Sequence, residues 1–307
     1  MTFAMVFPGQ GSQAPGMQSA LAEKYREVRQ TYADASEVLG FDLWELVQEG
    51  PAERLNETQV TQPAMLTAGF AAWRVWSRSG GSQPAYMAGH SLGEYTALVC
   101  AGSLSFQKAL QLVRRRAQLM QAAVPAGQGA MAAILGLDDD AVVAVCRGAA
   151  QDEVVEAVNF NSPGQVVIAG HRTAVERATA QAKEAGAKRA VLLNVSVPSH
   201  CALMKPAAAE LAKTLMETDF AEPTVPVISN VDVETYVTAE QIRAGLERQL
   251  YNPVRWTDTI RQIVADGATA IIECGPGKVL AGLTKRIDRS VDTISFDAPD
   301  AIDGSIR

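Results

Sequence analysis

Short apolar runs alternate with amphipathic stripes of helical length along most of this chain. Phe3–Phe7 and 84–88 are apolar runs of the length of a buried strand. Stripes with a period near 3.6 residues predict helices over about 18–38, 62–78 and 105–122. Thr61 is suited to cap the second of these helices, with Pro63 in its first turn. Strands that alternate with helices predict a mainly parallel sheet covered by helices.

From about residue 124 the pattern changes to the order β-α-β-β-α-β. The predicted strands are Ala130–Leu137, Val154–Asn159, Val166–Ala169 and Arg189–Val195, and the predicted helices are Asp138–Ala150 and Thr173–Ala185. Thr173 and Glu176 fit a capping box at the start of the second helix. This element order is that of a ferredoxin-like module.

We therefore predict an α/β protein of two domains. Residues 124–195 form a small ferredoxin-like domain, inserted into a larger domain made of residues 1–123 and 196–307. Further buried strands of the larger domain are expected at Val225–Ser229, Thr269–Glu273 and Ile294–Phe296.

Composition excludes several classes of function. The chain has 307 residues, 48% of them apolar and 20% charged, with a formal net charge of -7. An acidic chain lacks the basic footprint of most nucleic-acid-binding proteins, and no apolar run is long enough to cross a bilayer. The four cysteines, at positions 100, 146, 201 and 274, show no paired spacing, which argues against disulfides and a zinc site. A cytoplasmic protein is the prediction.

The segment Gly89-His90-Ser91-Leu92-Gly93 has the form of a nucleophile elbow. It follows a predicted strand and precedes a predicted helix, and its glycines permit a sharp turn around Ser91. Such a turn lifts the serine hydroxyl above the sheet edge, toward the free N–H groups of the next helix, where a developing oxyanion is stabilised. The segment indicates covalent acyl chemistry.

A serine nucleophile needs a general base, and only three histidines are present. His90 is adjacent to Ser91 and should point in another direction, while His171 is expected in a loop of the small domain. Elimination favours His200, which lies where the chain leaves that domain. No acidic residue stands out between Ser91 and His200, so a carbonyl or amide could hold the imidazole instead. A dyad of this kind suits thioesters better than amides.

One arginine falls on an apolar helix face. The stripe that faces the core of the helix over 105–122 consists of Ala109, Leu112, Val113, Arg116 and Met120. A charge on that face is costly unless an anion meets it. Glu94 and Asp258 are candidate structural partners, and a substrate carboxylate is the functional alternative. The sequence leaves both open.

Taken together, these motifs resemble the malonyl-CoA:acyl-carrier-protein transacylases of bacterial fatty-acid synthesis over nearly the whole chain. The matching segments, in family order, are Phe7–Gln13, Thr61–Ala64, Gly89–Tyr95, Arg116 with Met120-Gln121, Asn159–Gln165, Val197–His200, Asn252–Val254 and Gly275–Leu280. One departure is Ala117, where the family pattern has glycine. It should add only a methyl group to the pocket wall.

The resemblance implies a hydrolase-like domain with a ferredoxin-like insertion, and it implies residue roles. Ser91 would take malonyl from coenzyme A as an ester, with His200 as base. The N–H groups of Gln10 and Leu92 would form the oxyanion hole, and Arg116 would bind the malonyl carboxylate. The main-chain carbonyl of Gln249 would orient the imidazole. No cofactor or metal is implied.

The resemblance also implies a transient partner, an acidic acyl-carrier protein whose phosphopantetheine thiol accepts the malonyl group. Docking then needs a local basic patch, for which Arg189, Lys285 and Arg286 are candidates. Rival interpretations are an esterase or thioesterase, a non-catalytic carrier-docking module, and a related acyltransferase of polyketide assembly. Gln10 and Arg116 argue against the first, and the intact Ser91 and His200 against the second. Leu92 and Val197-Pro198-Ser199 favour the fatty-acid enzyme over the third.

Overall fold

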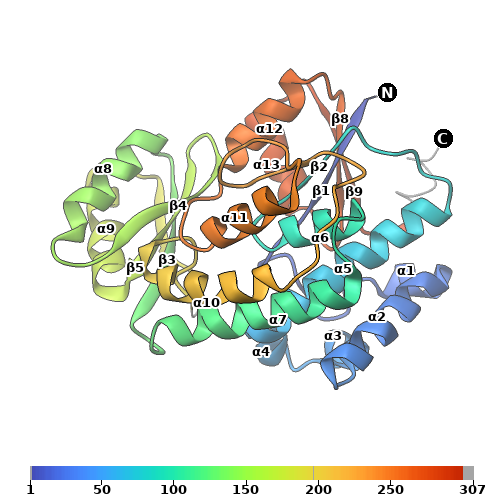
Figure 1. Ribbon diagram of the computed structural model, residues 1–307. Helices are drawn as coiled ribbons and strands as arrows, with labels where there is room; N and C mark the ends of the chain where they lie inside the picture. Colours follow the sequence, from blue (N-terminus) through green and yellow to red (C-terminus); the bar gives the residue numbers. More distant parts are fainter. Residues whose placement is uncertain (1, 196, 300–307) are drawn as a thin grey trace.

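Two separate sheets form the framework of the protein, whose computed structural model describes residues 2–195 and 197–299. The larger sheet is parallel, in the order β7-β2-β1-β8-β9. Its strands are β1 (Phe3–Phe7), β2 (Tyr86–Gly89), β7 (Val227–Ile228), β8 (Ala270–Cys274) and β9 (Asp292–Phe296). The smaller sheet is antiparallel and lies beside it with its own pair of helices (Figure 1).

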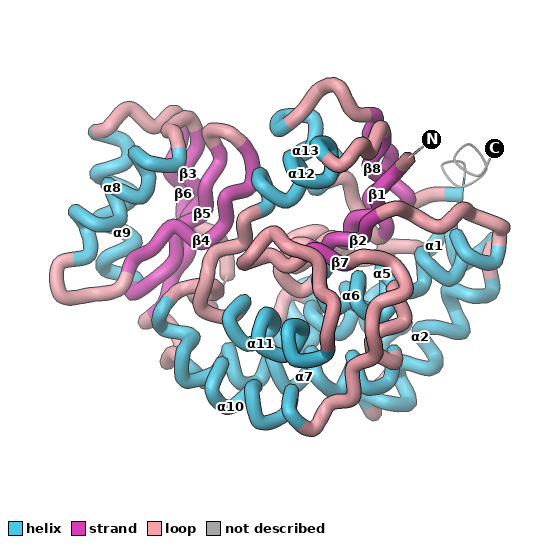
Figure 2. The backbone as a smooth tube through the Cα atoms, turned by 45° about the horizontal axis from the view of Figure 1, so that its top comes forward, coloured by secondary structure: helices cyan, strands magenta, loops and turns pink. Residues whose placement is uncertain are grey.

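Helices cover both faces of the parallel sheet. They are α1 (Ser19–Lys24), α2 (Arg26–Leu39), α3 (Leu43–Glu49), α4 (Ala52–Leu55), α5 (Thr58–Arg78), α6 (Gly93–Cys100), α7 (Phe106–Ala123), α10 (Lys205–Met216), α11 (Ala239–Gln249), α12 (Trp256–Ala265) and α13 (Val279–Ile287), with a 3₁₀ turn at Ala202–Met204. Figure 2 shows these helices grouped around the parallel strands, with the antiparallel strands at one side. In the described part of the chain, no helix is long and apolar enough to cross a membrane.

Alternation of side chains along β1 divides the larger core into two layers. Phe3, Met5 and Phe7 point to one face and join a cluster with α5, α6 and α7. Ala4 and Val6 point to the other face, against α12 and α13. Every residue of β1 is buried, which explains why the strand reads as a continuous apolar run rather than an alternating one.

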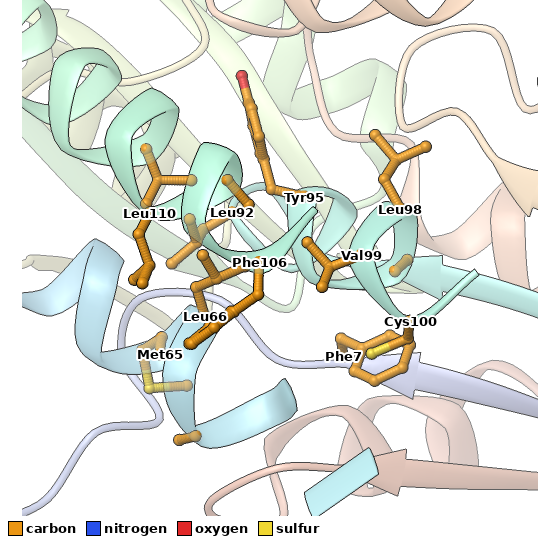
Figure 3. Close-up of a cluster of buried hydrophobic side chains, with 14 of the residues drawn as sticks. Phe7, Met65, Leu66, Leu92, Tyr95, Leu98, Val99, Cys100, Phe106 and Leu110 are labelled. Carbon is orange, nitrogen blue, oxygen red and sulfur yellow. The ribbon is translucent and has the colours of Figure 1, made fainter. Parts of the chain in front are cut away.

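The first layer of the core fixes the segment that follows β2. Figure 3 shows Leu92 and Leu98 packed in the same apolar cluster as Phe7 of β1 and Phe106 of α7, and all four are buried. The ring of Tyr95 stands at the side of this cluster, with its hydroxyl pointing away from it. Burial of the Leu92 side chain therefore holds the start of α6 against the sheet.

The smaller sheet has the strand order β4-β5-β3-β6, which with its helices is the ferredoxin-like arrangement expected from the element order. Its elements are β3 (Gly129–Leu135), α8 (Asp139–Ala150), β4 (Val155–Ser162), β5 (Gln165–His171), α9 (Arg172–Glu184) and β6 (Arg189–Leu192). Ala132 and Ile134 of β3 pack against the two helices. Met131, on the opposite face, packs with Cys201, which lies early in the long connection from β6 back to the larger sheet.

Backbone hydrogen bonds tie strand β4 of the smaller sheet to the segment that precedes α12 of the larger domain. The N–H of Phe160 in β4 donates to the carbonyl of Val254, and the N–H of Val254 donates to the carbonyl of Val158, at 3.0 and 2.9 Å. Domain boundaries at 124 and 195 remain a prediction that is consistent with strands β3 to β6. Ser196 and residues 300–307, part of the predicted larger domain, lie outside the described residues.

Several local predictions were wrong. The stripe over 18–38 contains two helices, α1 and α2, separated by the extended residue Tyr25. Neither glycine nor proline marks that break, so periodicity alone joined them. Helix α5 begins at Thr58, so Thr61 is not its cap. The Thr61 hydroxyl instead donates to the Leu55 carbonyl at 2.6 Å.

In the small sheet, Thr173 does not form a capping box with Glu176. Helix α9 begins at Arg172, so its cap position is His171, which makes no side-chain cap hydrogen bond. Thr173 lies inside the first turn, and its hydroxyl donates to Glu153 at 2.5 Å. Strand β6 ends at Leu192 rather than Val195. Beyond Leu193, which still pairs with Met131, the chain turns away from the sheet.

Candidate active site

A strained turn at Ser91 joins β2 to α6. Ser91 has a left-handed backbone, with φ of 53°, a conformation that is uncommon outside glycine. A Cβ atom at Gly89 would lie 1.8 Å from the carbonyl carbon of Gly93, and one at Gly93 would lie 2.0 Å from the Phe7 carbonyl oxygen. Both glycines are therefore required by close backbone approach, as the elbow motif predicts.

Asn230 holds this turn from the neighbouring strand. Its Oδ1 accepts the Ser91 N–H at 2.7 Å, and its Nδ2 donates to the Gly89 carbonyl at 2.6 Å. Asn230 is fully buried just after β7, which pairs with β2. Asn230 was not among the site residues predicted from the sequence. A signal was present, because the carboxyl ends of neighbouring parallel strands meet at one edge of a sheet.

The Ser91 hydroxyl lies against the ring of His200, with 2.7 Å between Oγ and Nε2. On the other side of the ring, Nδ1 lies 2.6 Å from the carbonyl oxygen of Gln249. A carbonyl oxygen only accepts hydrogen bonds, so Nδ1 carries the proton of the neutral ring and Nε2 accepts from Ser91. This arrangement can remove the proton of the serine hydroxyl.

Burial keeps this imidazole uncharged. His200 is 3% exposed, and burial, together with the nearby charge of Arg116, lowers its pKa to about 3. A hydrogen bond from the His200 N–H to the Leu250 carbonyl, at 2.9 Å, fixes the backbone beside the ring. The ring is therefore neutral, and able to accept a proton, at neutral pH.

The rings of the other two histidines bond to groups other than the Ser91 hydroxyl, although His90 also lines the cavity beside it. The Nε2 of His90 lies 2.8 Å from Oδ1 of Asn161 in β4, which links the elbow to the smaller sheet. His171 is the last residue of β5 rather than a loop residue. Its Nδ1 accepts the N–H of Val154 at 2.9 Å.

Arg116 reaches the same hydroxyl from α7. Its guanidinium is buried, with Nη2 3.3 Å from the Ser91 Oγ. Two amide oxygens also accept from it: Oε1 of Gln62, 2.8 Å from Nη1, and Oε1 of Gln249, 2.9 Å from Nη2. Among the described residues, no ion pair involves Arg116.

The two carboxylates that the sequence offered as partners of Arg116 take other positions. Asp258 pairs with Arg255, at 2.8 Å between Oδ2 and Nη2. Glu94 faces Gln249, whose Nε2 donates to its Oε2 at 2.9 Å. Glu94 therefore reaches Arg116 only through the intervening amide of Gln249.

These groups border a cavity of about 290 Å³ between the two sheets. Gln10, Ser91, Leu92, Arg116 and His200 all line it. Its apolar wall is formed by residues of the small sheet and of α13: Met131, Ala133, Val167, Leu193 and Leu283. The described residues contain no group of three or more His, Cys, Asp or Glu side chains that could hold a metal ion.

The candidate docking residues lie in two different places on the structure. Arg286 of α13 donates to Gln165 at the start of β5. Leu135 of the central strand β3 lies opposite Gln165 on one side and opposite Arg189 of β6 on the other. Arg189 and Arg286 thus lie along one end of the small sheet, and Gln165 itself lines the cavity. Lys285 borders a separate hollow beside β9.

Comparison with known proteins agrees with this geometry. A family model described as an acyl transferase domain matches residues 4–298. The malonyl CoA-acyl carrier protein transacylase of Salmonella typhimurium is 57% identical over 304 residues, which cover 99% of this chain and 98% of that protein.

Solved structures agree as well. The crystal structure of an acyl carrier protein S-malonyltransferase from Vibrio cholerae is 60% identical, with a TM-score of 0.97 over 99% of both chains. The solved structure of a type II PKS acyl-carrier protein in complex with its malonyl-transacylase contains a chain that is 55% identical to this one. The TM-score is 0.99, over 100% of this chain and 99% of that one. The chain therefore belongs to the acyl transferase domain family, and within it to the malonyl CoA-acyl carrier protein transacylases.

Proposed function

We propose that this protein transfers malonyl from malonyl-CoA to the phosphopantetheine thiol of an acyl-carrier protein, in fatty-acid synthesis, through a malonyl ester of Ser91. The observation that carries the proposal is the contact of one hydroxyl with two buried groups. Ser91 Oγ lies 2.7 Å from the imidazole of His200 and 3.3 Å from the guanidinium of Arg116. The pair supplies a base for the serine and a cation for a dicarboxylic acyl group.

In the first half-reaction, His200 Nε2 takes the hydroxyl proton while Ser91 Oγ attacks the thioester carbon. Negative charge then develops on the carbonyl oxygen, where the N–H groups of Gln10 and Leu92 would stabilise it. The C–S bond breaks as the intermediate collapses, and the imidazolium returns the proton to the sulfur of coenzyme A. The products are the malonyl-serine ester and free coenzyme A.

The second half-reaction reverses these roles. His200 takes the proton of the carrier's thiol, and the sulfur attacks the ester carbon. The C–O bond to Ser91 breaks, and the proton passes from the imidazolium to the serine oxygen. The carbonyl of Gln249 accepts from Nδ1 throughout and holds the ring in the required tautomer.

Arg116 would select the acyl group. The carboxylate of a malonyl ester lies two carbon atoms beyond Ser91 Oγ, so it can fold back to a guanidinium that already contacts this oxygen. A carboxylate can accept two parallel hydrogen bonds from arginine. Acetyl, without this carboxylate, gains no such contact.

For the carrier protein we propose a docking surface that includes Arg189 and Arg286. Lys285 lies on the same helix as Arg286 but borders the separate hollow beside β9. Arg189 and Arg286 lie beside the cavity along one end of the small sheet. Carrier proteins of this class are acidic, and a local basic surface on a chain of net charge -7 directs such a partner to the cavity.

The proposed chemistry uses only side chains of this chain and the two thiols, without a cofactor. For the location we propose the cytoplasm. The four cysteines are free and buried, as is common where thiols stay reduced.

Substitution of the nucleophile tests the reaction directly. After incubation with malonyl-CoA, intact-mass spectrometry of the wild-type protein should show one added malonyl group, which leaves when the carrier protein is added. Ser91→Ala should show no added mass, because the ester oxygen is absent. Covalent labelling of this variant at another residue would exclude Ser91 as the nucleophile, and free malonate without transfer would identify a thioesterase.

Arg116→Ala should remove the preference for malonyl over acetyl. A charge-assisted hydrogen bond contributes about 1.5–3 kcal/mol, so kcat/KM for malonyl-CoA should fall roughly 10- to 150-fold relative to that for acetyl-CoA. Acylation rates with the two thioesters give the ratio. An unchanged ratio would leave Arg116 with a structural role only.

The low pKa of His200 predicts the pH dependence of the free enzyme. A histidine with its ordinary pKa near 6.5 would be about one-tenth neutral at pH 5.5. Since burial lowers the pKa of His200 to about 3, the base should remain neutral there. Labelling of Ser91 by a neutral fluorophosphonate probe should proceed at nearly the same rate at pH 5.5 and pH 7.5. An acid limb centred at pH 6.5 would contradict this, provided that circular dichroism shows an intact fold.

Charge reversal at the proposed docking surface should act on the carrier alone. Arg286→Glu should raise KM for the carrier protein about two- to fivefold, as expected for an exposed charge, while the rate of acylation by malonyl-CoA stays the same. Arg26→Glu is the matched control, because the Arg26 side chain is 88% exposed on α2, away from the cavity. Equal effects of the two variants would exclude a local docking role for Arg286.

A further inference from the structure

A fully buried carboxylate in the first turn of α6, Glu94, has no part in the steps above. Its Oε1 accepts a hydrogen bond from the hydroxyl of Tyr236. Its Oε2 accepts from Gln249 Nε2 at 2.9 Å and from the Asn230 N–H at 3.1 Å. All three partners donate, so the ionised form satisfies every one of them. These hydrogen bonds and the charge of Arg116 favour ionisation, and they oppose the burial that raises the pKa of Glu94 to about 7.

The Gln249 side chain lies between this carboxylate and Arg116. A carboxylate can only accept and a guanidinium can only donate, so the amide has a single orientation that satisfies both. Its Nε2 faces Glu94 and its Oε1 faces Arg116. The same Nε2 also lies 2.9 Å from the carbonyl of Ser91, so the amide is held on three sides.

The separation of Glu94 from Arg116 by one amide group affects how Arg116 can bind a substrate. A buried guanidinium needs a counter-charge, yet a direct ion pair would occupy the N–H groups that a substrate carboxylate requires. Here the counter-charge, Glu94, is one amide away. Burial lowers the pKa of Arg116, and the charge of Glu94 opposes this effect and favours the charged guanidinium. In the described part of the chain, Arg116 Nε is buried without any hydrogen-bond partner.

We propose that Glu94 is a positioning residue for malonyl selectivity, which acts through the Gln249 amide to hold Arg116 charged and open toward Ser91. Tyr236 and Asn230 fix the carboxylate, Glu94 fixes the amide, and the amide fixes the guanidinium. Gln249 also supplies the carbonyl that orients His200, so the same residue couples the cation to the base. This inference rests on the proposed malonyl transfer.

Glu94→Gln tests the role of the carboxylate at nearly constant size. The oxygen of the new amide can still accept from Gln249 and Asn230, with its NH2 turned toward the Tyr236 hydroxyl, but the negative charge is lost. The hydrogen bond that orients the Gln249 amide is then weaker, and Arg116 has no counter-charge beyond that amide. We expect kcat/KM for malonyl-CoA to fall about tenfold or more, with a much smaller loss for acetyl-CoA and for fluorophosphonate labelling of Ser91.

Glu273→Gln is the matched control. Glu273 is also fully buried, and its oxygens accept the N–H groups of Leu280 and Ala281 at 3.1 and 2.8 Å. Burial raises the pKa of both carboxyls to about 7. Glu273 has no hydrogen bond to Gln249 or Arg116, so its substitution should alter stability without altering the malonyl-to-acetyl ratio.

The double variant Glu94→Gln/Gln249→Glu separates selectivity from folding. It exchanges the two side chains and places the carboxylate directly against Arg116, where an ion pair should form. We expect a folded protein with acetyl transfer but without malonyl preference, because the new carboxylate competes for the guanidinium. If Glu94→Gln does not fold, Tyr236→Phe, which removes one donor to Glu94, should lower the ratio in the same direction by a smaller factor.

The wild-type protein is assayed first for transfer of malonyl to carrier protein. Failure there would overturn the proposed function itself. With transfer established, an unchanged malonyl-to-acetyl ratio in Glu94→Gln would overturn the positioning role, as would restored malonyl preference in the double variant. If Glu94→Gln does not fold, an unchanged ratio in Tyr236→Phe would overturn it.

Discussion

The hydrogen bond between His200 Nδ1 and the Gln249 carbonyl, 2.6 Å long, is the contact on which the rest of the site depends. It leaves Nε2 unprotonated and aimed at Ser91. An acidic residue in this place would stabilise an imidazolium through its full charge, whereas the uncharged carbonyl favours the protonated ring less and also fixes its tautomer and direction. A base of this kind is adequate for thioesters, whose thiolate leaving group is easily expelled.

Burial of the site explains its unusual polar content. Ser91 is surrounded by side chains that are nine-tenths or more buried: Glu94, Arg116, His200, Asn230 and Gln249. Polar groups removed from water are costly unless they are hydrogen-bonded, and here each bonds to the next. The network therefore has few alternative arrangements. This rigidity matters for a serine ester that must await a thiol and resist water.

The two sheets contribute different parts of this site. The parallel sheet supplies the nucleophile, held by Asn230 at the edge where β2 and β7 end. The antiparallel sheet supplies an apolar wall through Met131 and Val167, and the chain that leaves it carries His200. The cavity lies where these two parts meet, and backbone hydrogen bonds around Val254 are among the contacts that join them.

Local patterns were sufficient for the fold class, for most elements and for several site residues. The elbow was recognisable because Gly89 and Gly93 are required by backbone contacts within the turn itself. Arg116 was recognisable because one charge interrupts an apolar stripe. The break at Tyr25 was not recognisable, because neither glycine nor proline marks it. The true starts of α5 and α9 were not recognisable either, because the hydroxyls of Thr61 and Thr173 bond to other groups instead of capping these helices.

By itself, the sequence determined the alternation of strands and helices, the strained turn at Ser91 and the burial of Arg116, since each follows from neighbouring residues. Only the tertiary structure decided what meets that hydroxyl and that guanidinium. Asn230, Gln249 and Glu94 lie far from Arg116 along the chain, and no local rule sets the polarity of an amide held between a carboxylate and a cation. That polarity arises when donors and acceptors from separate elements are enclosed together, away from water.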